Sequence, residues 1–182
     1  MAILRVDDFR GKLVGGGARA NMFEVNVIFP GYAGGNTENT NFMCRAAQLP
    51  ASTVALVEVP FRGRIIKLAG DRSFEPWTIT VYNDTDFGIR NAFMSWMDGL
   101  NSHEGNEGTQ SDNSGIGTYA SSIEVNQLRQ DGSPASDGKY VLKNAFPTNV
   151  SAIDLDYAQV GEIEQFQVTL EYDYWTQDGV TN

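Results

Sequence analysis

Residues 69–84, AGDRSFEPWTITVYND, place three charged side chains just before an apolar alternation. Asp71, Arg72 and Glu75 offer two acids and a cation within five positions, which is the kind of cluster that active sites use. The same residues also suit architecture. A predicted turn at Gly70-Asp71 would let an Asp71–Arg72 salt bridge fix the angle between strands or reach a neighbouring copy. The rest of the chain must decide between these interpretations.

Other residues that could carry chemistry are few. The only histidine, His103, stands beside Glu104 and lacks the partners that a zinc site requires. Cys44, the only cysteine, is expected to be a small buried side chain and leaves no disulfide within the chain. Gly15–Gly17 follows no predicted strand and precedes no Gly-Lys-Ser/Thr, so it is no phosphate loop. The sequence therefore predicts no catalytic residue, metal or cofactor, and a protein that is not an enzyme.

Two pairs of carboxylates alternate with apolar residues near the C-terminus. Asp154 and Asp156 form one pair and Glu171 and Asp173 the other, each on a predicted strand. A glycosidase would use two carboxylates. Four like charges on neighbouring strands are more typical of a solvated face. Such a face also suits the wall of a water-filled passage.

Length and charge limit the possible partners. The chain has 182 residues, about one domain, and a net charge of −10. Residues 92–182 hold fourteen of the 23 acidic residues but three of the thirteen Lys and Arg. Tight binding to a phosphate backbone needs clustered Lys and Arg, so this balance argues against a nucleic-acid-binding protein. No stretch approaches the ~20 apolar residues that span a bilayer, and no membrane insertion is expected.

Apolar periodicity predicts a mainly β protein. One helix is expected within residues 84–99, because apolar residues recur there every three or four positions. Asp84, Thr85 or Asp86 can cap its start, and Gly99 suits the left-handed position after its end. No βαβ rhythm is present, so the pattern indicates an antiparallel two-sheet barrel or sandwich with one flanking helix. The predicted strands cover residues 23–29, 41–47, 64–69, 77–82, 119–128, 139–145, 152–157 and 163–175.

Three further segments complete a single domain over residues 1–182. Residues 1–20 are expected to form an arm, either flexible or ordered only against a neighbouring subunit. Residues 50–62 are extended, and their two prolines exclude the ends of the segment from a central strand. Residues 101–118 are polar and glycine-rich, which predicts an exposed loop.

Three blocks of sequence resemble the tail tube proteins of contractile-tailed bacteriophages. They are CRAAQLPASTVALVEVPFRGRIIKLAG (44–70), AGDRSFEPWTITVYND (69–84) and FPTNVSAIDLDYAQVGEIEQFQVTLEYDYW (146–175). The GGGARANMFEV start of the first strand also resembles that family. Residues 31–40, 101–118 and 129–139 depart from its pattern. The resemblance implies a two-sheet β-barrel with a flanking helix. It also implies that six subunits form a ring and that rings stack into a hollow tube inside a contractile sheath.

The resemblance also implies partners and roles in a virion. The tube would meet the sheath, baseplate and tail-terminator proteins, while the tape measure protein and DNA pass through the lumen without specific binding. An acidic lumen would repel phosphates over the ~8 Å screening length of physiological salt. Asp154 and Asp156 are predicted to line the lumen, and Glu171 and Asp173 to face the sheath. The predicted subunit-interface residues are Asp71, Arg72, Pro50, Pro60 and Phe61.

Two other functions stay open from the sequence. A type VI secretion tube or another phage-derived injection machine would share the fold. A monomeric carbohydrate-binding sandwich could use Trp77, Trp96 or Trp175. Trp96 on the apolar helix face and Trp77 in the strand alternation count against that second alternative. If the protein is a tube subunit, the charged residues of the 69–84 stretch have a structural role and not a catalytic one.

Overall fold

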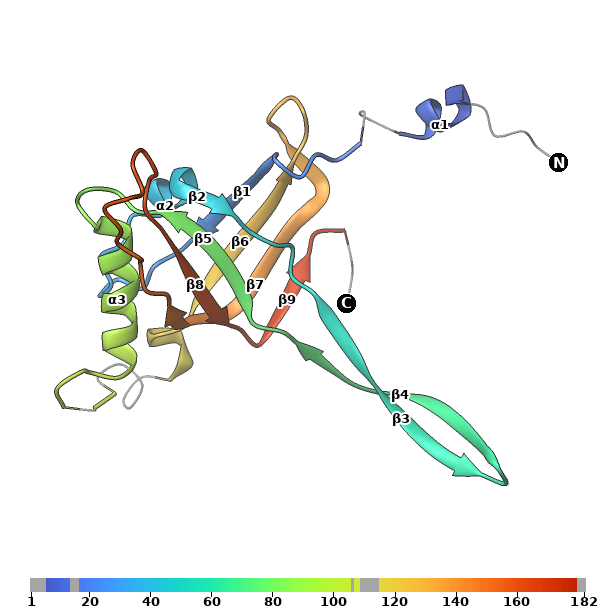
Figure 1. Ribbon diagram of the computed structural model, residues 1–182. Coiled ribbons are helices and arrows are strands. Elements are labelled where there is room, and N and C mark those ends of the chain that lie inside the picture. The colour runs from blue at the N-terminus through green and yellow to red at the C-terminus, as the bar shows by residue number, and fades with distance from the viewer. Residues whose placement is uncertain (1–5, 14–16, 106, 109–114, 180–182) are drawn as a thin grey trace.

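A long strand, β7 (Pro134–Val150), joins the two halves of the main sheet (Figure 1). The computed structural model describes residues 6–13, 17–105, 107–108 and 115–179, so Gly15 and Gly16 lie outside the described residues. Strand β7 pairs with β6 (Ser121–Leu128) along one edge. Along its other edge it pairs first with β9 (Tyr174–Gln177) and then with β8 (Gln165–Glu171). Asn144, with a left-handed φ of 57°, lies where this partner changes and lets the strand bend.

The remaining strands extend this sheet into an open barrel. All pairings are antiparallel, and the order is β1-β6-β7-β8-β5-β2 with β9 beside β7. The outer members are β1 (Phe23–Val27), β5 (Trp77–Tyr82) and the short β2 (Cys44–Ala46). The prediction of a mainly β, antiparallel barrel with a flanking helix is confirmed.

Strand alternation builds the core as the sequence predicts. On β5, Trp77, Ile79 and Val81 are buried, and their neighbours are half-buried on the other face. On β8 the buried residues are Phe166, Val168 and Leu170. Helix α3 (Gly88–Leu100) packs against the same core with its apolar stripe, which comprises Ile89, Ala92, Phe93 and Trp96.

The ends of α3 differ from the prediction. The N-cap is Phe87, which makes no side-chain capping bond, so none of the three predicted capping residues holds that position, although Asp84 accepts a hydrogen bond of 3.2 Å from the Gly88 amide. Gly99 lies inside the helix instead of following it. The reason is packing: a Cβ at Gly99 would lie 2.3 Å from the Tyr32 ring. The Tyr32 hydroxyl donates to the Trp96 carbonyl at 3.3 Å, which holds the ring against this turn of the helix.

Two short helices were not predicted. Helix α2 (Thr37–Met43) occupies part of a predicted loop and of the predicted strand 41–47. The Asn36 side chain caps this helix by accepting hydrogen bonds from the backbone amides of Glu38 and Asn39. Asparagine is a preferred N-cap residue, and the prediction overlooked it. Helix α1 (Val6–Lys12) lies within the predicted arm and buries none of its residues. A 3-10 turn, η2 (Ile116–Thr118), lies at the end of the predicted 101–118 loop.

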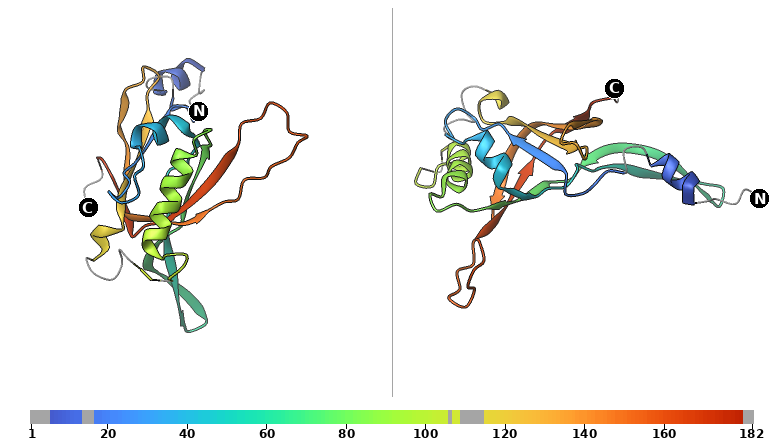
Figure 2. Two further views of the ribbon diagram at one scale, coloured as in Figure 1. Left: turned by 90° about the vertical axis from the view of Figure 1, so that its left-hand side faces the viewer. Right: turned by 90° about the horizontal axis from the view of Figure 1, so that it is seen from above.

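Residues 151–164 are the clearest error of the prediction. The expected strand 152–157 does not form, and the segment leaves the barrel as a projecting loop between β7 and β8 (Figure 2). Its apolar alternation has no sheet to face. The Asp156 carboxylate instead accepts from the Ala158 amide at 2.9 Å and closes a local turn.

The close packing at Gly99 predicts opposite effects of alanine at two glycines of one helix. Gly99→Ala should lower the free energy of unfolding by about 1–3 kcal/mol, because the Tyr32 ring must move. At Gly88 an added Cβ meets nothing within 4 Å. Gly88→Ala should therefore raise stability by up to ~1 kcal/mol through lower entropy of the unfolded chain. Urea unfolding of both variants measures this difference, and equal effects would contradict the packing argument.

Candidate subunit interface

Strands β3 (Ser52–Phe61) and β4 (Arg64–Phe74) form a two-stranded sheet of their own that projects from the barrel (Figure 1). The chain reverses at Arg62 and Gly63, whose φ angles are 45° and 82°. Two consecutive positive φ values define the tight hairpin turn that matches strand twist. The sequence prediction missed this turn and expected one at Gly70-Asp71, where β4 in fact continues.

The hairpin presents apolar side chains to solvent along its whole length. Each is between 41% and 60% exposed, although a two-stranded hairpin alone is marginally stable in water. Contiguous apolar surface of this kind marks an interaction site. The exposed residues are Val54, Leu56, Val57, Val59, Phe61, Ile65, Ile66 and Leu68.

Gly70 marks a bulge in β4. Val54 pairs with Arg72 and Leu56 with Ala69, so two residues of β4 oppose one of β3. A Cβ at Gly70 would lie 3.1 Å from the Ala55 carbonyl oxygen, which explains the glycine. Asp71 and Arg72 are both exposed, and within the described part of the chain neither forms an ion pair. A salt bridge that fixes the strand angle within the subunit is therefore absent, and a contact of Asp71 and Arg72 with a neighbouring copy stays a prediction.

The other predicted interface residues lie at the two ends of the hairpin. Pro60 and Phe61 are exposed beside the turn, where a neighbouring copy can reach them. Pro50 is buried before the start of β3, so its side chain serves the subunit itself. All these assignments to an interface stay predictions.

Tryptophan side chains hold the base of the hairpin to the barrel. The Trp77 indole donates to the Gln48 carbonyl at 2.6 Å, and the Trp175 indole donates to the Ala51 carbonyl at 3.2 Å. Phe74, at the end of β4, packs against Tyr172 with ring centroids 6.0 Å apart. Residues 69–84 thus form the base of a projecting arm. Their role in this subunit is structural, not that of an active-site cluster.

The same contacts argue against a sugar-binding platform. Trp77 and Trp96 are buried in the core, and the Trp96 indole donates to the Tyr119 carbonyl at 2.7 Å. Trp175 is half-buried and packs edge-on against Tyr140. Two of the three tryptophans are thus part of the core, and the third is attached to the subunit through Ala51 and Tyr140.

The remaining chemical candidates are separated from one another. His103 meets Asp98 at 2.7 Å on the surface, and hydrogen bonds from His103 lower the pKa of the Asp98 carboxyl. Burial raises the pKa of the Cys44 thiol to about 11, so at neutral pH it is a thiol and a poor nucleophile. Within the described ranges, no group of three His, Cys, Asp or Glu side chains could hold a metal ion. No described helix is long and apolar enough to cross a membrane.

The predicted acidic pairs occupy different surroundings. Asp154 and Asp156 are exposed on the projecting 151–164 loop, not on a strand. Glu171 is half-buried on the face of β8 opposite the core. Asp173 is exposed after β8, and its carboxylate accepts a hydrogen bond of 2.6 Å from the side-chain amide of Asn144.

A barrel that extends apolar segments into solvent has the surface of a protein that binds other chains. Comparison with known proteins agrees. Residues 18–178 match the family described as "Phage tail tube protein". The chain is 36% identical over 158 residues to the tail tube protein gp19 of Enterobacteria phage T4, covering 87% of this chain and 90% of that one. It is 27% identical over 172 residues to the tail tube protein of Serratia phage KSP90, covering 92% and 93%.

Solved structures share the fold at lower identity. The anti-feeding prophage tube terminating cap superposes with a TM-score of 0.62 at 17% identity, covering 97% of this chain and 93% of that chain. A sheath–tube complex of an extracellular contractile injection system gives a TM-score of 0.58 at 15% identity, covering 98% and 100%. The chain belongs to the phage tail tube protein family. It is a structural component of the tail tube and therefore of the virion.

The exposed hairpin predicts a variant that folds but does not assemble. Val59 and Ile66 are cross-strand partners, and neither is buried in the subunit. Val59→Ser with Ile66→Ser should change subunit stability by no more than about 0.5 kcal/mol, as is usual for surface sites. Sedimentation velocity should show subunits in place of large particles.

The matched control changes two residues outside the hairpin that are similarly exposed, Ile28 at 46% and Ile116 at 42%. The double variant Ile28→Ser with Ile116→Ser should assemble. Normal assembly of the hairpin variant would contradict the assignment.

Proposed function

We propose that this protein forms six-membered rings that stack into the tail tube of a phage with a contractile tail, through which DNA leaves the particle. The exposed apolar hairpin carries the proposal. It projects from one part of the barrel, and in this proposal a different surface of a neighbouring copy covers it. Contacts between two different surfaces are heterologous, and they form rings where they close and filaments where they repeat.

The same assembly determines the partners we propose. A stacked tube ends in a baseplate and in a terminator, and its outer wall is enclosed by a sheath protein. The solved relatives support this arrangement, because they are described as a baseplate, a tube terminating cap and a sheath–tube complex. The family match and the phage relatives favour a phage tail over a secretion or toxin-injection machine. The tube acts without catalysis in this proposal.

For the wall of the passage, the structure leads us to propose a different surface from the one predicted. Asp154 and Asp156 are not on a strand, whereas the non-core face of β5 and β8 is a regular polar surface. It carries Thr80 and Gln167, which are cross-strand partners, and Glu171 lies further along β8. The same surface also holds Arg45, which donates to the Gln165 side chain beside Thr80 and Gln167. The hydroxyls, amides and carboxylates around it add no positive charge, so in this proposal DNA and the tape measure protein slide along the wall. We keep Asp173, which lies beyond β8, as a sheath-facing candidate.

Electron microscopy of the purified protein tests the proposal directly. Negative-stain images should contain six-fold rings and tubes of uniform width. Particles of another symmetry, or subunits that stay monomeric at every concentration, would overturn it.

A lysine in the passage should slow DNA. Gln167 is exposed on the proposed wall, so Gln167→Lys adds one positive charge per subunit to the lumen without touching the core. Particles with this variant should release DNA more slowly at low salt and recover at 1 M salt, where the screening length falls to ~3 Å. A DNA-binding dye measures the release.

The control for this variant lies on the other side of the subunit. Asn91 is exposed on α3, which packs on the core side of the sheet, so Asn91→Lys should leave release unchanged. Equal release from Gln167→Lys and wild-type particles would place another surface in the lumen.

A further inference from the structure

The projecting loop 151–164 combines apolar and acidic side chains in full contact with solvent. Leu155 is 80% exposed, Val160 is 89% exposed and Tyr157 is fully exposed. The loop holds four carboxylates, Asp154, Asp156, Glu162 and Glu164, and no Lys or Arg. Large apolar side chains at such exposure are a feature of surfaces that another molecule covers.

The base of this loop is firmly attached to the barrel. The Arg90 guanidinium on α3 donates to the Ser151 carbonyl at 2.9 Å, and the Ser151 amide donates to the Gln167 carbonyl at 2.8 Å. At the other end, the amide and the side chain of Asn83 donate to Glu164, both at 2.9 Å. The loop is therefore held at a defined place, which lowers the entropy cost of binding a partner there.

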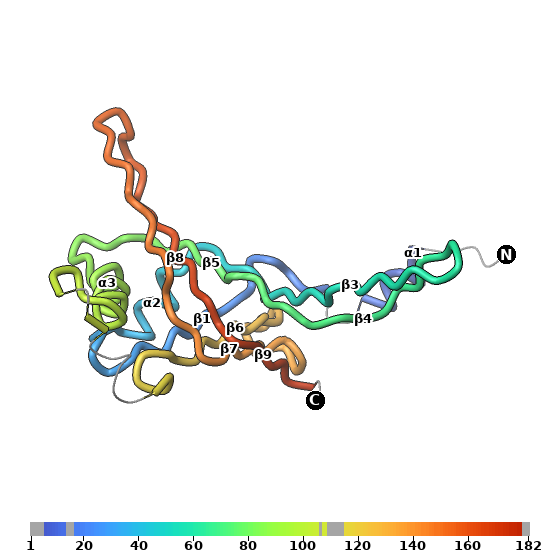
Figure 3. The backbone as a smooth tube through the Cα atoms, turned by 90° about the horizontal axis from the view of Figure 1, so that it is seen from below, coloured from blue at the N-terminus to red at the C-terminus, as the bar shows by residue number. Residues whose placement is uncertain are grey.

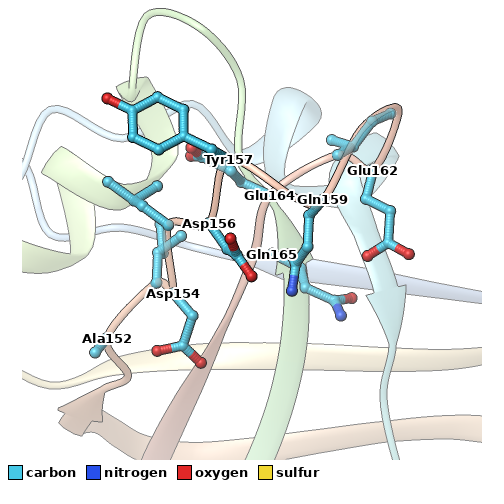
Figure 4. Close-up of a pocket in the computed structure, with 11 residues that line it drawn as sticks. Ala152, Asp154, Asp156, Tyr157, Gln159, Glu162, Glu164 and Gln165 are labelled. Atoms are coloured by element: carbon cyan, nitrogen blue, oxygen red, sulfur yellow. The ribbon is translucent and has the colours of Figure 1, made fainter.

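The two arms of the loop enclose an acidic concavity of about 580 Å³ (Figure 4). Asp154, Asp156 and Glu162 line it together with Tyr157. Within the described residues, neither Asp154 nor Glu162 forms an ion pair. A cationic group with apolar neighbours would match this lining, since a guanidinium binds carboxylates through paired hydrogen bonds and stacks on aromatic rings.

The hairpin tip has the complementary composition. Hairpin residues 52–74 include four Lys or Arg against two acidic residues. At the tip, the Arg62 guanidinium lies 5.4 Å from the centroid of the Phe61 ring, and Arg64 follows one residue beyond the turn. The other exposed apolar segment, α1, has two acidic and two basic residues and is a weaker electrostatic match.

The loop and the hairpin extend from the barrel in different directions (Figure 3). The loop and the hairpin of one subunit therefore cannot contact each other, whereas the loop of one copy can contact the hairpin of another. We propose that the hairpin tip of one copy, with Phe61, Arg62 and Arg64, inserts between the acidic arms of the 151–164 loop of a neighbouring copy. This inference rests on the proposed tube function, and it identifies two surfaces through which the subunits of the tube contact each other.

Charge exchange between the two surfaces tests this contact. Asp154→Lys with Glu162→Lys reverses the loop and spares Asp156, whose side chain closes the turn. Arg62→Glu with Arg64→Glu reverses the hairpin tip. Each double variant should reduce the amount of protein in tubes at least tenfold, measured by pelleting and microscopy. The quadruple variant should recover most of the tubes, because the ion pairs form with their signs exchanged.

The controls separate this contact from folding and from tube formation itself. Circular dichroism and thermal unfolding of each variant should match the wild-type subunit. Glu104→Lys with Glu107→Lys makes the same change of charge at exposed residues outside the loop and should form tubes. Normal tubes from either double variant would overturn the contact and leave the tube function standing. Loss of tubes without recovery in the quadruple variant would overturn it too and assign the loop another occupant, such as α1. An absence of tubes from the wild-type protein would instead refute the proposed function.

Discussion

The structure depends on one constraint: the β3–β4 hairpin exposes eight large apolar side chains that its own subunit cannot cover. A two-stranded sheet has no third strand and no helix against which to bury them. In the proposed tube, contact with other copies supplies the free energy that stabilises the hairpin. The folding of the arm then depends on assembly, whereas the barrel has a core of its own.

The barrel provides the arm with a fixed origin. Trp77 and Trp175 donate to backbone carbonyls just before β3, and Phe74 closes the end of β4 against Tyr172. Burial, and after it the nearby carboxylates of Glu171 and Glu75, raise the pKa of the Tyr172 hydroxyl above its ordinary value. Both indole N–H groups are thus used by the fold itself. A rigid body with defined projections suits a subunit that must repeat identical contacts many times.

The sequence predicts the core well because its periodicities reflect burial within one chain. The alternation from Trp77 to Val81 and the 3.6-residue stripe of α3 both have a partner surface inside the subunit. Prediction failed where apolar residues serve other contacts. Residues 152–157 alternate like a strand, yet no neighbouring strand receives them, so Leu155 and Tyr157 stay exposed. The turn at Arg62-Gly63 could have been predicted from its glycine. The helix start at Asn36 could have been predicted too, because asparagine is a common N-cap residue. The bulge at Gly70 could not be predicted, because it depends on the register between two strands.

Amide hydrogen exchange of β3 and β4, compared between isolated subunits and assembled tubes, tests the central claim most directly. Amides whose hydrogen bonds open locally exchange fast, and those held by packing exchange slowly. We expect fast exchange throughout the hairpin in the free subunit, with protection at β5 and β8 already complete, and strong protection of the hairpin in tubes. Equal protection of β3 and β4 in both states would show that the hairpin is stable by itself and would contradict the dependence of the arm on its neighbours.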